Sequence, residues 1–191
     1  MSNNLSFEEA FEHFLSSRKS VGAKFLTAPA PSLDDYRAAI KTALAVPDHM
    51  RLHPCRVVVI NNRQRLADLF AQGLLETGGS EEEVDKVKSK ALKAPAMLAL
   101  IVSVDPNNPR VPEYEQWMTA GGFLTVFLNV LEARGYAGKI VSGSNTRYPS
   151  VVNELCNPNE KIAAWVMVGT AKEDAQFDIK RPSADDYLSE W

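Results

Sequence analysis

The sequence predicts an α+β protein in which helices surround a small mixed or antiparallel sheet. Helical patterns outnumber strand patterns, and the two do not alternate in the regular β-α-β order that builds a parallel sheet. Runs typical of strands occur at 55–60, 96–104 and 163–170, with a shorter one inside the glycine-punctuated segment 134–145. Because the sequence shows neither an internal repeat nor a low-complexity segment, we expect residues 1–191 to form a single domain.

Capping boxes mark the starts of helices in the first half of the chain. In each box the serine hydroxyl accepts a hydrogen bond from the backbone amide of the residue three positions later. That residue is acidic, and its side chain accepts a hydrogen bond from the serine amide. The pairs are Ser6 with Glu9, Ser32 with Asp35, and Ser80 with Glu83. The first box precedes an apolar stripe containing Phe7 and Phe11, and we expect that helix to continue toward Gly22. The second helix is expected to end at Pro47.

The middle of the chain adds a helix over the apolar residues of 66–75 and the apolar run 96–104, which is typical of a strand buried on both faces. A long helix is expected at 113–134, interrupted by Gly121-Gly122. Glycine inside a helix destabilises it by about 1 kcal/mol relative to alanine. Such a doublet therefore suggests that another backbone, or a flat ligand, approaches closely. A short helix at 150–155 precedes the last strand.

The C-terminal tail, about 171–191, is polar but carries spaced large apolar residues. These are Phe177, Ile179, Tyr187 and Trp191. Because such a segment is unlikely to form a core of its own, we expect it to pack on a second subunit.

Composition excludes several classes of protein. The net charge of −3 gives no basic field for nucleic acid or an anionic membrane surface. The N-terminal residues lack the pattern of a signal peptide, and we find no apolar segment of the ~18 residues that a membrane span needs. Cys55 and Cys156 lie far apart in the sequence, which favours reduced thiols. We therefore expect a cytoplasmic protein.

The linker "AVPDHMRLHPC" concentrates polar side chains between a helix and a strand. His49, His53 and Cys55 could be metal ligands, but Pro54 directs Cys55 into the strand and a fourth ligand is not evident. A Cys–His nucleophile pair lacks an orienting group. The sequence also has neither a dinucleotide-binding glycine fingerprint nor a Walker lysine.

Arg18-Lys19-Ser20 allows two interpretations. Cations near a helix C-terminus complement the helix dipole, and this structural role is the more common one. Alternatively, a guanidinium fork and a hydroxyl can hold phosphate or ribityl oxygens.

Taken in order, several segments resemble the FMN-dependent nitroreductases, and specifically their compact, YdjA-type branch. The segments are "RKS", "AVPDHMRLHPCRVVVI", "KAPAMLALIV", "QWMTAGGFLTVFLNVLEARGYAG" and "AAWVMVGT". The resemblance covers nearly the whole chain, and it lies in the ordered set of segments because each one alone is weakly specific.

The resemblance implies a bound FMN. Arg18 and Ser20, with Lys19 between them, would hold its phosphate and ribityl chain. Arg181, within the basic tail segment 180–182, could add charge at the phosphate.

The resemblance also implies a homodimer. The loop residues Pro47, Asp48 and His49 would line the flavin of the opposite subunit, and the backbone of Ile140, Val141 and Ser142 would lie along the ring. The branch has tryptophan and arginine where this chain has Ile140 and Val141, so an aromatic ring and a cation are missing beside the flavin.

The implied function is that of an NAD(P)H oxidoreductase. A hydride would pass from NADH or NADPH to FMN and then to a nitro, quinone or similar small acceptor, with no catalytic side chain required. Two alternatives remain: a flavin-binding dimer with little or no turnover, and a metal-dependent enzyme built on His49, His53 and Cys55.

Overall fold

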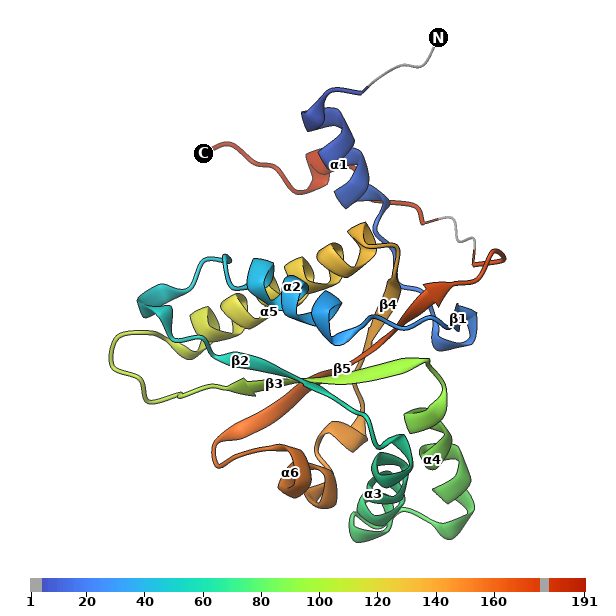
Figure 1. The fold of residues 1–191 in the computed structure, drawn as a ribbon. Helices are drawn as coiled ribbons and strands as arrows, with labels where there is room; N and C mark the ends of the chain where they lie inside the picture. Colours follow the sequence, from blue (N-terminus) through green and yellow to red (C-terminus); the bar gives the residue numbers. More distant parts are fainter. Residues whose placement is uncertain (1–4, 176–178) are drawn as a thin grey trace.

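The computed structural model describes residues 5–175 and 179–191, and within these residues five strands form one sheet (Figure 1). The strands are β1 (Leu26–Thr27), β2 (Cys55–Val59), β3 (Ala96–Ser103), β4 (Ala137–Val141) and β5 (Glu160–Ala171). All the strand pairs in the described residues are antiparallel. β3 lies between β2 and β5, and β5 also pairs with β4 and with β1.

Helices cover both faces of the sheet (Figure 1). α2 and α5 pack together on one face, while α3, α4 and α6 lie on the other. Their bounds are α1 (Phe7–Ser17), α2 (Leu33–Ala43), α3 (Arg63–Glu76), α4 (Val84–Leu92), α5 (Glu113–Ala133) and α6 (Pro149–Leu155). The predicted α+β class, with an antiparallel sheet enclosed by helices, is confirmed.

β3 divides the hydrophobic core into two layers. Successive side chains of a strand point to opposite faces of the sheet. Leu98 and Leu100 accordingly pack with the α2 and α5 side, whereas Met97 and Ala99 pack with the α3 and α4 side. All four are buried, which confirms the prediction of a strand covered on both faces.

α1 stands apart from the sheet and its helices (Figure 1). Every side chain of α1 is exposed or half-buried, and the rings of Phe7 and Phe11 stack on one another with centroids 5.9 Å apart. The tail returns to this helix, because the Arg181 guanidinium donates to the carbonyl oxygens of Ser16 and Arg18. The apolar stripe predicted for α1 is therefore present, but within the described residues it covers no core.

The three predicted capping boxes are present. The first helix was predicted to run toward Gly22, and this is wrong: it ends at Ser17, because Arg18 is already extended (φ −54°, ψ 128°). The short strand β1 was not predicted. It forms where β5 continues beyond β4 and offers its edge to Leu26 and Thr27. Among the described residues, no helix is long and apolar enough to cross a membrane. Phe177 lies outside the described residues.

Candidate functional site

A cavity of about 310 Å³ opens on the α3 and α4 side of the sheet, between the end of α4, β4 and β5. Its floor is apolar and includes Met97, Trp165 and Met167. Lys90 and Lys93 at the end of α4 and Lys139 on β4 are also part of its lining, so the cavity lies among three cationic residues. An apolar floor beneath several cations suits a flat ligand that carries negative charge.

The loop after β4 forms one wall of this cavity. Val141, Ser142, Gly143 and Asn145 all line it. The indole Nε1 of the buried Trp165 donates to Asn145 Oδ1 at 3.3 Å, and the Thr146 hydroxyl donates to the Gly143 carbonyl oxygen at 2.8 Å. The first bond ties the loop to β5, and the second braces the loop internally.

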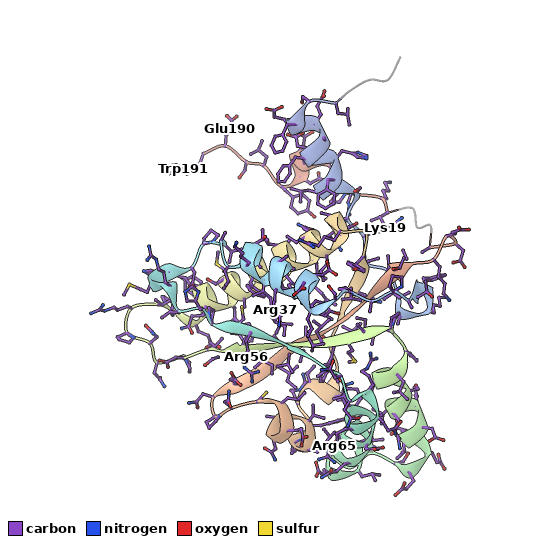
Figure 2. The ribbon with its side chains drawn as sticks, in the orientation of Figure 1. Lys19, Arg37, Arg56, Arg65, Glu190 and Trp191 are labelled. Atoms are coloured by element: carbon purple, nitrogen blue, oxygen red, sulfur yellow. The ribbon has the colours of Figure 1, made fainter. Side chains whose placement is uncertain are left out.

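The segment 18–23 runs beside the edge strand β4, since the Val21 amide donates to the Gly138 carbonyl at 3.0 Å. Arg18 and Lys19 line a narrow cleft that also contains Glu132 near the end of α5. Burial raises the pKa of Glu132, and the charges of Arg18 and Lys19 oppose that rise. Figure 2 shows Lys19 where the chain leaves α1 and joins the rest of the protein.

Arg181 adds a third cation beside this segment. Its guanidinium donates to the Arg18 carbonyl at 2.5 Å, so the tail brings the charge of Arg181 to the Arg18–Ser20 segment. The Ser20 side chain is exposed. Arg18, Lys19, Ser20 and Arg181, the residues predicted to hold a phosphate, therefore lie close together beside β4.

The loop of Asp48 to His53 has an unusual backbone. Met50, Arg51 and His53 all have positive φ, a region that non-glycine residues seldom occupy. The Asp48 carboxylate, of which 10% is exposed, accepts hydrogen bonds from the amides of Leu52 (3.1 Å) and His53 (2.8 Å). Asp48 thus holds the loop in this conformation, and such strain is concentrated at functional sites.

His49 projects from this loop onto a second cavity, of about 410 Å³, against the first half of α5. Its Nδ1 lies 2.6 Å from Glu115 Oε2. The cavity wall is otherwise mostly apolar and includes Val46, Pro47 and Met118. The Thr119 hydroxyl donates to the Pro47 carbonyl at 3.2 Å and ties the loop to α5.

The predicted site residues therefore fall into three places within one chain. Val141 and Ser142 line the lysine-rich cavity, Arg18 and Lys19 line the cleft along β4, and Pro47 and His49 line the cavity on α5. Ile140 is exposed. Because side chains alternate along a strand, Ile140 lies on the face of β4 opposite to Lys139 and Val141.

The residues suggested as metal ligands have other partners. His49 pairs with Glu115, and His53 Nδ1 lies 3.3 Å from the Asp48 carboxylate. Burial, together with the charge of Asp48, raises the pKa of the Cys55 thiol to about 11, so the thiolate that binds metals is disfavoured. Within residues 5–175 and 179–191, no group of three or more histidine, cysteine or acidic side chains is placed to hold a metal ion.

Sequence reasoning missed Lys90, Lys93 and Lys139 in the lining of the first cavity, and Glu115 as the partner of His49. The lysines are distributed over two elements without a recognisable motif. Glu115 is 66 residues away from His49 in the sequence. The sequence indicated only that Glu115 lies in the first turn of α5. An acidic residue is common at that position in any helix, so it did not suggest a partner for His49.

Comparison with known proteins assigns the fold. The Nitroreductase-like Family Protein from Bacillus cereus superimposes with a TM-score of 0.78 over 100% of this chain and 98% of that chain, at 18% identity. The FMN-dependent nitroreductase NfnB from Mycobacterium smegmatis, solved in complex with NADPH, gives a TM-score of 0.73 over 97% of this chain and all of that one, at 16% identity.

The sequence comparisons agree. A "Putative NAD(P)H nitroreductase" from Haemophilus influenzae is 29% identical over 178 residues, which are 92% of this chain and 96% of the relative. The "Putative NAD(P)H nitroreductase YdjA" from Escherichia coli K12 is 27% identical over 171 residues, covering 87% of this chain and 92% of the relative. The sequence model of the nitroreductase family matches residues 15–170 of this chain.

The fold and these matches define an oxidoreductase enzyme of the nitroreductase-like class. The chain belongs to the nitroreductase family, as its motifs predicted, and it resembles the YdjA-type members of that family.

Proposed function

We propose that this protein is an FMN-dependent oxidoreductase that takes electrons from NADH or NADPH. The carrying observation is the 310 Å³ cavity, in which the predicted residues Val141 and Ser142 stand over an apolar floor with Lys90, Lys93 and Lys139 around it. The residue types fit a flavin: the floor suits a flat aromatic ring, and the lysines suit its electron-rich edge or its phosphate. The names of related proteins, which include FMN and NADPH, support the same cofactors.

The phosphate end of the cofactor is assigned to the segment beside β4. Ala23 lines the lysine-rich cavity, while Arg18 and Lys19 lie a few residues earlier in the same segment, which is bonded to β4 through Val21. Arg181 stands next to Arg18. Arginine forks and a serine hydroxyl are well suited to a phosphate group.

A homodimer with a shared site accounts best for the positions of His49 and Arg18. Within one chain they line different cavities, so both can contact one flavin if the α5 cavity of one chain covers the flavin of the other. Phe7, Tyr114 and Met118 leave most of their side chains exposed. Apolar surface costs about 25 cal/mol per Å² in water, which favours its burial against a second copy.

The tail supports the same assembly. Figure 2 shows Glu190 and Trp191 at its free end, extending away from the sheet. Tyr187 and Leu188 are more than three-quarters exposed. Ala171, Ala175 and Arg181 contact their own chain. We therefore assign the exposed end of the tail, around Tyr187 and Leu188, to the surface of the partner, and we treat residues 1–191 as one domain.

When bound, the flavin supplies the chemistry: it accepts a hydride from NAD(P)H and returns two electrons to an acceptor. The chain positions the reactants and supplies charge. Lys90, Lys93 and Lys139 offset negative charge on a ligand above Trp165, and the fixed loop at Ser142 sets the height at which a ring can lie. The cavity on α5 provides a mostly apolar space for a nitro, quinone or similar small acceptor.

We assign the protein to the cytoplasm, and the supporting observation is that Cys55 and Cys156 are both free thiols.

The visible spectrum tests this function. FMN titrated into the purified protein should bind with the altered absorbance of a protein-bound flavin, and anaerobic NADH or NADPH should bleach it. Absence of binding at saturating FMN would refute the proposal. Binding without bleaching by either donor would instead identify a flavin-binding dimer without turnover.

A further inference from the structure

A histidine–carboxylate pair lies on the wall of the α5 cavity. His49 Nδ1 and Glu115 Oε2 are 2.6 Å apart, and the Tyr114 hydroxyl donates to the other Glu115 oxygen at 3.3 Å. The His49 side chain is 52% exposed and that of Glu115 is 30% exposed. Because Nδ1 is engaged, Nε2 is the nitrogen that remains for a molecule in the cavity. Within the part of the chain that the structure describes, Nε2 has no other hydrogen-bond partner.

Two separately fixed elements set the geometry of this pair. His49 belongs to the loop that Asp48 holds through the amides of Leu52 and His53, against the strain of three positive φ angles. Glu115 lies in the first turn of α5, where the helix dipole favours a carboxylate. The bond from Thr119 to the Pro47 carbonyl joins the two elements. The strained loop brings one side chain, His49, against a helix. Strained backbone of this kind is typical of functional sites.

The rest of the cavity selects the kind of molecule that His49 meets. Val46, Pro47 and Met118 form apolar walls, and Gly122 adds no side chain to the lining. A flat, uncharged ring fits these walls. A ring bearing an oxygen that takes up a proton as it is reduced would also use the imidazole.

We propose that His49 is a catalytic proton donor to the acceptor, and that Glu115 is the positioning residue that orients its ring. The proposal rests on the proposed function, since it assigns to this cavity the acceptor half of that reaction. The acceptors are quinones and other ring compounds that are protonated on oxygen. The reaction implied by the sequence requires no catalytic side chain, and His49 would add one.

The step balances for a quinone. The quinone would take up two electrons and one proton, as a hydride equivalent, from the reduced flavin of the proposed function, which would thereby be oxidised. His49, present as imidazolium, gives the second proton from Nε2, so that both C=O bonds become the C–O–H groups of a hydroquinone. The neutral imidazole keeps its proton on Nδ1, facing Glu115, and regains the other from water.

The test separates acceptors by their need for protons. Enzyme saturated with FMN is reduced by NADH or NADPH without oxygen and then mixed with p-benzoquinone or with ferricyanide, which takes electrons alone. Positioned general acids contribute roughly 10²–10⁴-fold to a rate. We expect Glu115→Gln and His49→Gln to lower the benzoquinone-to-ferricyanide rate ratio at least tenfold. His53→Gln is the matched control, because His53 lies on the same loop but is not in the cavity lining, and it should keep the ratio of the unchanged protein.

A spectroscopic readout accompanies the rates. In the ¹⁵N NMR spectrum of the flavin-free protein, the Nδ1 proton of His49 should be protected from exchange with water, and Glu115→Gln should remove that protection. An unchanged rate ratio in both cavity variants, or an equal fall in His53→Gln, would overturn the proton-donor role while flavin binding and bleaching still uphold the proposed function. A protein that binds no FMN, or whose FMN neither donor reduces, would overturn both.

Discussion

Arg56 and Glu160 show how single residues secure the frame of the site. The Arg56 guanidinium donates to both Glu160 oxygens, at 2.8 and 2.6 Å, and to the Leu155 carbonyl at 2.9 Å. These bonds join β2, the end of α6 and the start of β5. The hydrogen bond from Arg56 is the main reason that the pKa of Glu160 falls from 4.5 to about 2.

This shift predicts a pH-dependent contribution to stability. A carboxyl whose pKa is lower in the folded protein stabilises the fold above its unfolded pKa, and the contribution disappears as the pH falls toward the folded value. Glu160→Gln should therefore lower the free energy of unfolding by about 1–3 kcal/mol near neutral pH, because bonds to charged groups contribute this much and solvent at Arg56 screens the pair. The difference from the unchanged protein should shrink between pH 4.5 and about 2. Denaturant titrations across this range measure it, and a constant difference would contradict the assignment.

Arg18 gives a second prediction at this scale. Hydrogen bonds to charged groups contribute about 1.5–3 kcal/mol, so Arg18→Ala should weaken FMN binding roughly tenfold to hundredfold. Titration with FMN measures the affinity, and circular dichroism checks that the fold is retained. Unchanged affinity would remove Arg18 from the phosphate site.

Among the elements, α5 connects the fold to the proposed site. Its apolar side packs on β3 through residues such as Phe127, and its first turn carries Glu115. The glycine doublet at its centre was predicted to admit another backbone or a flat ligand. In the described residues nothing lies within 4 Å of a Cβ built on Gly121, and one built on Gly122 would meet Val46 at an ordinary 3.6 Å. Contacts within the chain therefore do not require glycine at these two positions. The close approach of a partner or a ligand stays a prediction.

Gly121→Ala tests this prediction. Alanine in place of a helix-interior glycine should stabilise the isolated chain by about 1 kcal/mol. If the partner packs on α5 at this point, the added methyl group should weaken the dimer roughly tenfold, as sedimentation equilibrium would measure. Gly122→Ala is the comparison, because its methyl group would rest on Val46 of the same chain and should disturb association less. Dimers of equal strength in all three proteins would place the interface elsewhere.

For the molecule as a whole, features that depend on neighbouring residues in the sequence could be predicted. Features that depend on contacts between distant segments could not. The capping boxes and the run 96–104 identify helices and the central strand because their signals lie within a few residues. β1 escaped prediction because two residues become a strand only beside the end of β5. Likewise Lys93 and Lys139 meet at one cavity through the packing of α4 against the sheet, which spacing in the sequence does not encode.

The sequence also led to part of the lining of the candidate cavities, and the role of these residues in holding a cofactor stays a prediction. The family motifs led to Arg18, His49 and Ser142, and these residues do line clefts and cavities or lie next to residues that do. Motifs could not show that the Asp48 carboxylate is engaged by the backbone of its own loop, because that bond depends on the left-handed residues that follow.

The central claim is that one flavin site is built from two chains, and mixing two variant proteins tests it most directly. An Arg18→Ala/Ser20→Ala chain is damaged on the phosphate side of each site, and a His49→Ala chain on the covering side. A heterodimer of the two has one site with every defect and one site with none. After subunit exchange, FMN titration should show a new class of sites with the affinity of the unchanged protein, at most one per heterodimer and absent from both parents. If exchange is demonstrated and no such sites appear, Arg18 and His49 serve a site within a single chain, and the shared site is contradicted.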